Sequence, residues 1–239
     1  MSPLVESVVR FLRSTIGTKV LMALTGLALV GFLVAHLAGN LQMLAPGGKA
    51  PELMNAYAAQ LKGLGPLLWI ARIGLLGTFA LHVALAIRLT ALNKAARPVP
   101  YAVKEPLAST MASRSMVLSG LVILAFVIYH LLHFTLGVTD PAAYHLTDSL
   151  GQHDVYSMFV LGFQKAPVAI AYVIAMLCLG LHLAHGIQSL FQTLGWNGPR
   201  YRPLTKAIGL GITGLIVAGN IAMPLAVLFG VIRLPGAGA

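Results

Sequence analysis

The chain has 239 residues, of which 58% are hydrophobic and 9% are charged, whereas a soluble domain carries roughly 25% charged residues. This composition predicts an integral membrane protein with room for about five spans of ~20 residues and for no sizeable soluble domain. The formal net charge of +10 does not indicate nucleic-acid binding, because the basic residues lie in short loops between apolar segments, where the positive-inside rule accounts for them.

Five apolar runs are long enough to cross a bilayer as helices. The predicted spans are residues 19–44, 66–93, 114–138, 167–193 and 204–232. Each run exceeds the ~20 residues that a helix needs to cross the hydrocarbon core. The expected fold is therefore all-α, a bundle of five transmembrane helices that forms a single membrane domain over residues 1–239.

The segments before and between the first spans are short. Residues 1–18 combine Arg10 and Arg13 with apolar residues in a pattern compatible with an amphipathic helix on the membrane surface. Residues 51–62 predict a second short helix, at the interface, because Pro51 suits a first helical turn and apolar residues recur at helical spacing. The connection over residues 94–113 contains several prolines and is expected to be irregular.

The distribution of Lys and Arg predicts the orientation of the bundle. One side carries Arg10, Arg13, Lys19, Arg88, Lys94, Arg97, Lys104, Arg114, Arg200, Arg202 and Lys206. The other side carries Lys49, Lys62, Lys165, Arg233 and Arg72. Cytoplasmic loops are the ones enriched in cations, so the N-terminus is expected in the cytoplasm and the C-terminus outside. The connection over residues 139–165, with half of the acidic residues, then faces outward.

Histidines in four spans are the main candidates for function. Counting along the helices places His36 and His130, late in odd spans, in the outer half of the bilayer. His82 and His182, late in even spans, fall in the inner half. Ionisable groups at membrane depth mark functional sites, and imidazole is a common axial ligand of haem iron. Two pairs at two depths predict two bis-histidine haems, each held between facing helices.

Two further histidines leave the choice of ligands open. His133 and His185 each lie three residues after a candidate ligand and share its helical face. Either member of each doublet could bind haem, and the other could bond a propionate, a carbonyl or a quinone. A single buried histidine can also be a packing residue. A metal or proton transporter lined by histidines is the alternative from another class, although these spans lack the Asp and Glu that such a path commonly uses.

The remaining candidate side chains have simple structural interpretations. Cys178 is the only cysteine and lies within a span, so we expect a small buried apolar residue and no iron–sulfur ligand set in this chain. His145 and His153 are expected on the solvated surface of the outer connection. Arg72, near the outer end of the second span, could pair with a haem propionate or a quinone carbonyl, or could be an ordinary interfacial arginine.

Five stretches of the sequence form a recognisable set. They are RSTIGTKVLMALTGL at residues 13–27, HLAGNL at 36–41, LHVALAI at 81–87, SGLVILAFVIYH at 119–130 and LHLAHGIQSLFQTLGWNG at 181–198. With them the chain resembles, over essentially its whole length, the five-helix, two-haem cytochrome b membrane anchors of bacterial succinate dehydrogenases and fumarate reductases. The last stretch is the most specific.

The resemblance implies a choice within each histidine doublet. In relatives the third-span ligand follows a glycine by ten positions, which selects His130 after Gly120. The fourth-span ligand precedes a glycine by thirteen positions, which selects His182 before Gly195. The implied axial ligands are therefore His36 paired with His130, and His82 paired with His182.

The resemblance also implies a function, as the anchor and electron-transfer subunit of a succinate:quinone oxidoreductase in the bacterial inner membrane. Succinate would be oxidised on a flavoprotein subunit that carries FAD. Electrons would pass through an iron–sulfur subunit on the basic cytoplasmic face and two b haems to a quinone, expected to be menaquinone. Some fumarate-reducing relatives place a glutamate of a proton path where this chain has Gly180, which puts that path in doubt. The haem b anchor of another quinone-linked dehydrogenase is the alternative within redox chemistry.

Overall fold

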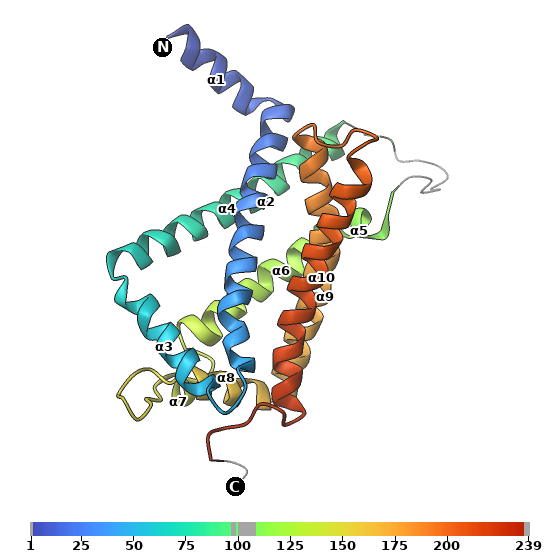
Figure 1. The fold of residues 1–239 in the computed structure, drawn as a ribbon. Coiled ribbons are helices and arrows are strands. Elements are labelled where there is room, and N and C mark those ends of the chain that lie inside the picture. Colours follow the sequence, from blue (N-terminus) through green and yellow to red (C-terminus); the bar gives the residue numbers. More distant parts are fainter. Residues whose placement is uncertain (1, 97–98, 100–108, 237–239) are drawn as a thin grey trace.

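The computed structural model describes residues 2–96, 99 and 109–236. Across these residues the regular elements are all helical, and one isolated bridge joins Thr147 to His153. The long helices are α2 (Thr15–Asn40), α4 (Pro66–Ala95), α6 (Met116–His130), α9 (Ala166–Thr193) and α10 (Arg202–Leu228) (Figure 1). Each of them, α6 together with the π-helical turn that follows it, is long and apolar enough to cross a membrane. The predicted all-α, multi-pass membrane fold is therefore confirmed.

Helix α9 is the centre of the bundle. It packs on α10, α6 and α2, while α4 packs along α2. Its buried side chains recur every three or four residues from Ala169 to Leu190, which is the pattern of a helix with one broad face against its neighbours. In Figure 1, α2, α9 and α10 run close together, and α4 and α6 cross the view at a tilt. Helices α10, α6 and α2 therefore lie against α9, and α4 lies against α2.

The N-terminal residues form a separate helix, α1 (Pro3–Arg13), which projects from the bundle in Figure 1. Ser14 ends α1 and caps α2, because its Oγ accepts a hydrogen bond of 3.0 Å from the N–H of Gly17. A serine at the N-cap position accepts a hydrogen bond from a backbone N–H of the first turn that has no partner within the helix. Helix α2 consequently begins four residues before the expected start of the first span at residue 19.

The end of the bundle opposite the N-terminus is closed by short elements. These are η1 (Leu41–Leu44), α3 (Ala50–Gly63), α7 (Pro141–Tyr144) and α8 (Val155–Gln164). Helix α8 lies in the connection that was expected to be a loop, and seven of its ten residues are buried. Asp154 caps it through a hydrogen bond of 2.9 Å from the N–H of Ser157. Ten apolar residues cannot cross a bilayer, so this helix packs against the bundle instead.

The third span is not one continuous α-helix. A short helix, α5 (Met111–Arg114), precedes α6, and α6 ends at His130. A π-helical turn, η2 (Leu131–Thr135), follows directly. Such turns hold one extra residue and are frequent at functional sites, because they rotate the side chains that follow. The span therefore ends at Thr135, three residues before the expected end at residue 138.

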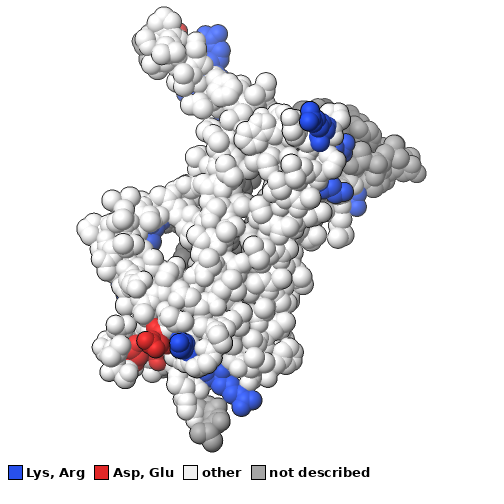
Figure 2. All heavy atoms as spheres, viewed as in Figure 1, with Lys and Arg blue, Asp and Glu red and all other residues white. Residues whose placement is uncertain are grey.

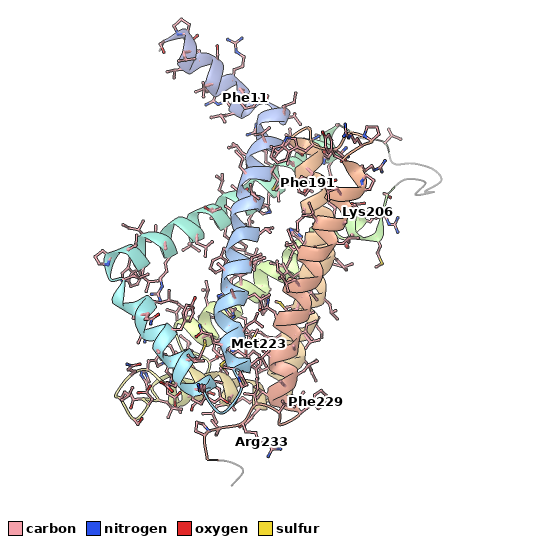
Figure 3. The ribbon with its side chains drawn as sticks, in the orientation of Figure 1. Phe11, Phe191, Lys206, Met223, Phe229 and Arg233 are labelled. Atoms are coloured by element: carbon pink, nitrogen blue, oxygen red, sulfur yellow. The ribbon has the colours of Figure 1, made fainter. Side chains whose placement is uncertain are left out.

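The two ends of the bundle differ in charge. Figure 2 shows Lys and Arg at both ends, whereas most of the acidic side chains gather at the end opposite the N-terminus, next to some of the cations. Figure 3 shows Phe11 and Lys206 toward the first end and Phe229 and Arg233 at the other. The predicted irregular residues Arg97, Pro98, Pro100, Lys104 and Pro106 lie outside the described part of the chain. Most of the described acidic side chains thus lie at the end that the predicted orientation places outside.

Candidate functional site

The outer histidine pair joins α2 to α6. The ring centroids of His36 and His130 lie 5.8 Å apart and the ring planes are nearly perpendicular, at 89°. Phe32, one helical turn before His36, stacks on its imidazole with the centroids 5.3 Å apart. Two residues that are 94 positions apart in the sequence therefore face each other at one level of the bundle.

The inner pair joins α4 to α9. The ring centroids of His82 and His182 lie 6.5 Å apart, at an interplanar angle of 60°. Glycines on the two other helices border these rings. A Cβ added to Gly26 of α2 would lie 3.5 Å from Cε1 of His82, and one added to Gly120 of α6 would lie 3.7 Å from Cε1 of His182. At these two positions the helices thus present backbone, with no side chain, beside the Cε1 edge of each imidazole.

The two pairs fit the axial ligands of haem iron. Bonds of about 2 Å from one metal ion to two opposite imidazole nitrogens would place the ring centroids roughly 6 Å apart, close to both observed separations. Within the described residues, no group of three or more His, Cys, Asp or Glu could hold a metal ion. A pair suffices for haem, because the macrocycle supplies the other ligands, whereas a structural metal site made by protein alone commonly needs four.

Hydroxyl groups lie behind three of the four imidazoles. Thr25 Oγ1 is 3.0 Å from Nδ1 of His82, and Ser119 Oγ is 3.3 Å from Nδ1 of His182. Tyr172 Oη is 3.3 Å from Nδ1 of His130. In each case the hydroxyl belongs to a neighbouring helix, so the contact fixes a ring across a helix–helix interface. None of these three contacts was predicted, because each joins residues on different helices.

His133 has surroundings quite different from those of His130. It is buried, and its Nδ1 lies 3.0 Å from Tyr172 Oη. Phe134 stacks on its ring, with the centroids 4.0 Å apart. A Cβ added to Gly162 of α8 would lie 2.9 Å from its Nε2, so the backbone of α8 closes the space beside this nitrogen. The structure places His130, and not His133, opposite His36.

His185 and Arg72 are not members of the two facing histidine pairs. His185 is half-buried, one turn beyond His182 on α9. Arg72 is exposed on α4, and its guanidinium lies over the ring of Trp69 at 5.2 Å from the centroid. Stacking of a cation on an aromatic ring near a span end is typical of the membrane interface. The geometry of Arg72 is therefore that of the interfacial arginine considered above.

One of the two histidines in the connection over residues 139–165 is not on the solvated surface. His145 is exposed as expected, but His153 is half-buried and forms a bridge between two backbone segments. Its Nε2–H donates to Tyr144 O at 2.6 Å, so its Nδ1 accepts from Lys62 Nζ at 3.0 Å. Burial, together with the charge of Lys62, lowers the pKa of His153. His153 thus fastens α3 to the connection as a neutral ring.

A buried amide holds the same region together. Asn55 of α3 donates through Nδ2 to Asp148 at 3.2 Å and to Asp154 at 3.1 Å, and its Oδ1 accepts from the N–H of Tyr156 at 3.0 Å. Burial acts to raise the pKa of Asp154, but hydrogen bonds from Ser157 and Asn55 outweigh it, and the pKa is lowered overall. These carboxylates have a structural role that the expected solvated loop did not include.

A comparison with protein families gives one match. The model for the transmembrane subunit of succinate dehydrogenase/fumarate reductase matches residues 90–223. This range covers more than half of the chain and includes His130 and His182. No curated protein and no solved structure matches the chain.

Proposed function

Because the chain belongs to the family of succinate dehydrogenase/fumarate reductase transmembrane subunits, we propose that it is the membrane anchor and electron-transfer subunit of a succinate:quinone oxidoreductase. The observation that carries this proposal is the presence of two facing histidine pairs, each made by two different spans. Succinate chemistry belongs to a flavoprotein partner with FAD, since we assign no succinate site to this chain.

The histidines are proposed to hold two b haems, one at each level. His82 and His182 would hold the inner group, and His36 and His130 would hold the outer group. Bound there, the haems would supply one-electron transfer between the iron–sulfur clusters of a partner subunit and a quinone, for which we propose menaquinone. All four histidines are partly buried between apolar helices.

The basic end of the bundle is proposed to be the cytoplasmic face and the docking face for the iron–sulfur subunit. Among the described cations, Arg88 donates to the carbonyl oxygen of Arg13 on α1, and Lys206 lies toward the same end in Figure 3. Cytoplasmic segments next to spans carry an excess of Lys and Arg. A partner with a complementary acidic surface would be steered to this end and away from the acidic one.

The alternatives are less well supported. A metal transporter needs a path lined by several ligands, whereas the described residues give only pairs of histidines and no cluster of three. The haem anchor of another quinone-linked dehydrogenase would share the paired histidines. The family match favours the succinate dehydrogenase/fumarate reductase complex over that alternative.

Purification of the complex tests the proposal. The reduced-minus-oxidised visible spectrum should show b-type haem, with two haems for each copy of this chain, and succinate should reduce a quinone analogue in the presence of the partner subunits. A complex without haem b, or one that carries haem but passes no electrons from succinate to a quinone, would refute it.

A further inference from the structure

We propose that the hydroxyl groups of Thr25, Ser119 and Tyr172 fix the tautomers of His82, His182 and His130, so that each imidazole keeps its proton on Nδ1 and presents a bare Nε2 to the iron. This inference rests on the proposed function, because it concerns residues that would hold haem. It adds three positioning residues, and it makes His36 the exception.

The hydrogen bonds of Thr25 determine the proton position on His82. Thr25 Oγ1 lies 2.9 Å from the carbonyl oxygen of Leu21 and 3.1 Å from that of Met22. A carbonyl oxygen can only accept, so the single hydroxyl proton of Thr25 is directed there. The contact of 3.0 Å between Thr25 Oγ1 and His82 Nδ1 is then made by the proton of the ring. A neutral imidazole carries one N–H, so Nε2 of His82 is bare.

Ser119 repeats the arrangement at the facing ring. Its Oγ donates to the carbonyl oxygen of Met116 at 3.2 Å and lies 3.3 Å from Nδ1 of His182. Because the single hydroxyl proton of Ser119 is directed to Met116 O, the contact with His182 is made by a proton on Nδ1 of the ring. Both members of the inner pair therefore turn a bare Nε2 away from their hydroxyl partners.

Tyr172 lies between two histidines and has one proton to give. Its Oη is 3.0 Å from Nδ1 of His133 and 3.3 Å from Nδ1 of His130. If the tyrosine donated to His130, the proton of that ring would sit on Nε2 and block iron binding. Ligation by His130 requires the opposite order, in which His130 Nδ1–H donates to Tyr172 and Tyr172 donates to His133. His133 is then the acceptor that orients the tyrosine hydroxyl.

Burial makes these hydroxyls hard to replace with water. The exposed fractions are 8% for Thr25, 2% for Ser119 and 6% for Tyr172. His36 differs, because its ring stacks on Phe32 and faces His130, and within the described part of the chain no hydroxyl bonds it. The inner pair thus has two such partners and the outer pair has one.

The consequence is electronic as well as geometric. An imidazole that donates its second N–H to an acceptor is held in one orientation and is a stronger base toward the metal. A stronger base stabilises the ferric state, so removal of the acceptor should raise the reduction potential. The expected change in the ferric-to-ferrous ratio at a given potential is at most roughly tenfold, which is ~59 mV for one electron.

The test is a redox titration of the purified complex with single variants. Thr25→Val and Ser119→Ala should each raise the midpoint potential of the same haem component. At a given potential, the ferric-to-ferrous ratio of that component should change by up to about tenfold. Tyr172→Phe should raise the midpoint of the other component. Thr25→Ser should restore the value of the unmodified protein. Thr18→Val is the matched control, because Thr18 is buried on the same helix and its hydroxyl bonds only the carbonyl oxygen of Ser14 among described partners.

The outcomes separate this inference from the proposed function. If the unmodified complex contains no haem b, the proposed function fails. If the unmodified complex contains two haems, and both midpoint potentials are the same in Thr25→Val as in Thr18→Val, the proposed function stands and the tautomer assignment is wrong. A shift of the same component by Thr25→Val and Tyr172→Phe would also overturn it. Haem content for each chain, measured on every variant, identifies a loss of folding, and Thr25→Ser then shows whether the hydroxyl itself matters.

Discussion

Replacement of one inner histidine should remove one haem and leave the other recognisable. On α2, His36 of the outer pair and Gly26, which borders the inner pair, are ten residues apart, and Gly120 and His130 have the same spacing on α6. At ~1.5 Å per residue both helices place the two levels about 15 Å apart. Two sites at this distance share no ligand, so His82→Leu should lower the haem content from two to one for each chain.

The distance also limits the effect on the haem that remains. One unit of charge at about 15 Å contributes roughly 1 kcal/mol at an effective dielectric constant of ~20. The midpoint of the remaining component should therefore move by no more than the equivalent of about 1 kcal/mol in His82→Leu and in His182→Leu, and it should be the same component in both. His36→Leu and His130→Leu should leave the other one.

The assay is haem quantification with a redox titration followed in the visible spectrum. His185→Leu is the control, because it removes a histidine one turn from His182 and should retain both haems. Loss of both haems in a folded His82→Leu variant would refute the two-level model. Loss of a haem in His185→Leu but not in His182→Leu would show that the ligand on α9 is His185, one turn beyond His182.

Three further predictions concern the parts around the pairs. Gly162→Val should disturb the packing of His133 and destabilise the protein by about 1–3 kcal/mol while the haem content persists. Gly74→Ala should have little effect, because a Cβ at that position meets nothing within 4 Å. Thermal unfolding in detergent measures both variants. Asn55→Ala removes three hydrogen bonds, two of them to carboxylates, and should cost roughly 2–5 kcal/mol, whereas Asn93→Ala on the exposed end of α4 should not change the unfolding temperature. Because burial and Lys62 hold the pKa of His153 below its ordinary value, its contribution to stability is complete above about pH 6.5 and is lost as the pH falls toward the lowered pKa; His153→Gln should flatten the acid side of a stability–pH profile.

The spans could be predicted from sequence because a lipid environment leaves few choices. Each backbone group must be satisfied within its own segment, so a long apolar run has to be a helix. The rise per residue then assigns a depth to every side chain, and this was sufficient to expect His36 near His130 and His82 near His182. Both pairs of rings are close in the structure, while their role as ligands stays a prediction.

Other parts could not be predicted, because they depend on contacts between distant segments. The apolar run in α8 is too short for a span and was assigned to a loop, although its burial under the bundle makes it a helix. The separation of His130 from His133 depends on the π-helical turn and on the space closed by Gly162. Sequence spacing alone treats the two histidines as equivalent neighbours on one face. The hydroxyl of Tyr172 lies 42 positions from His130, so no local pattern indicates their contact.

The connectivity of the pairs has a consequence for biogenesis. His82 and His182 are 100 positions apart, and α4, which packs along α2, is synthesised long before α9. At ~5–20 residues per second, a ribosome needs roughly 5–20 s to make the chain between the two histidines. During this interval α4 is already made while the helix that completes its site is still absent. Each pair can close only after its later helix has been made, so a cofactor held by both rings of a pair would be captured after that point in synthesis.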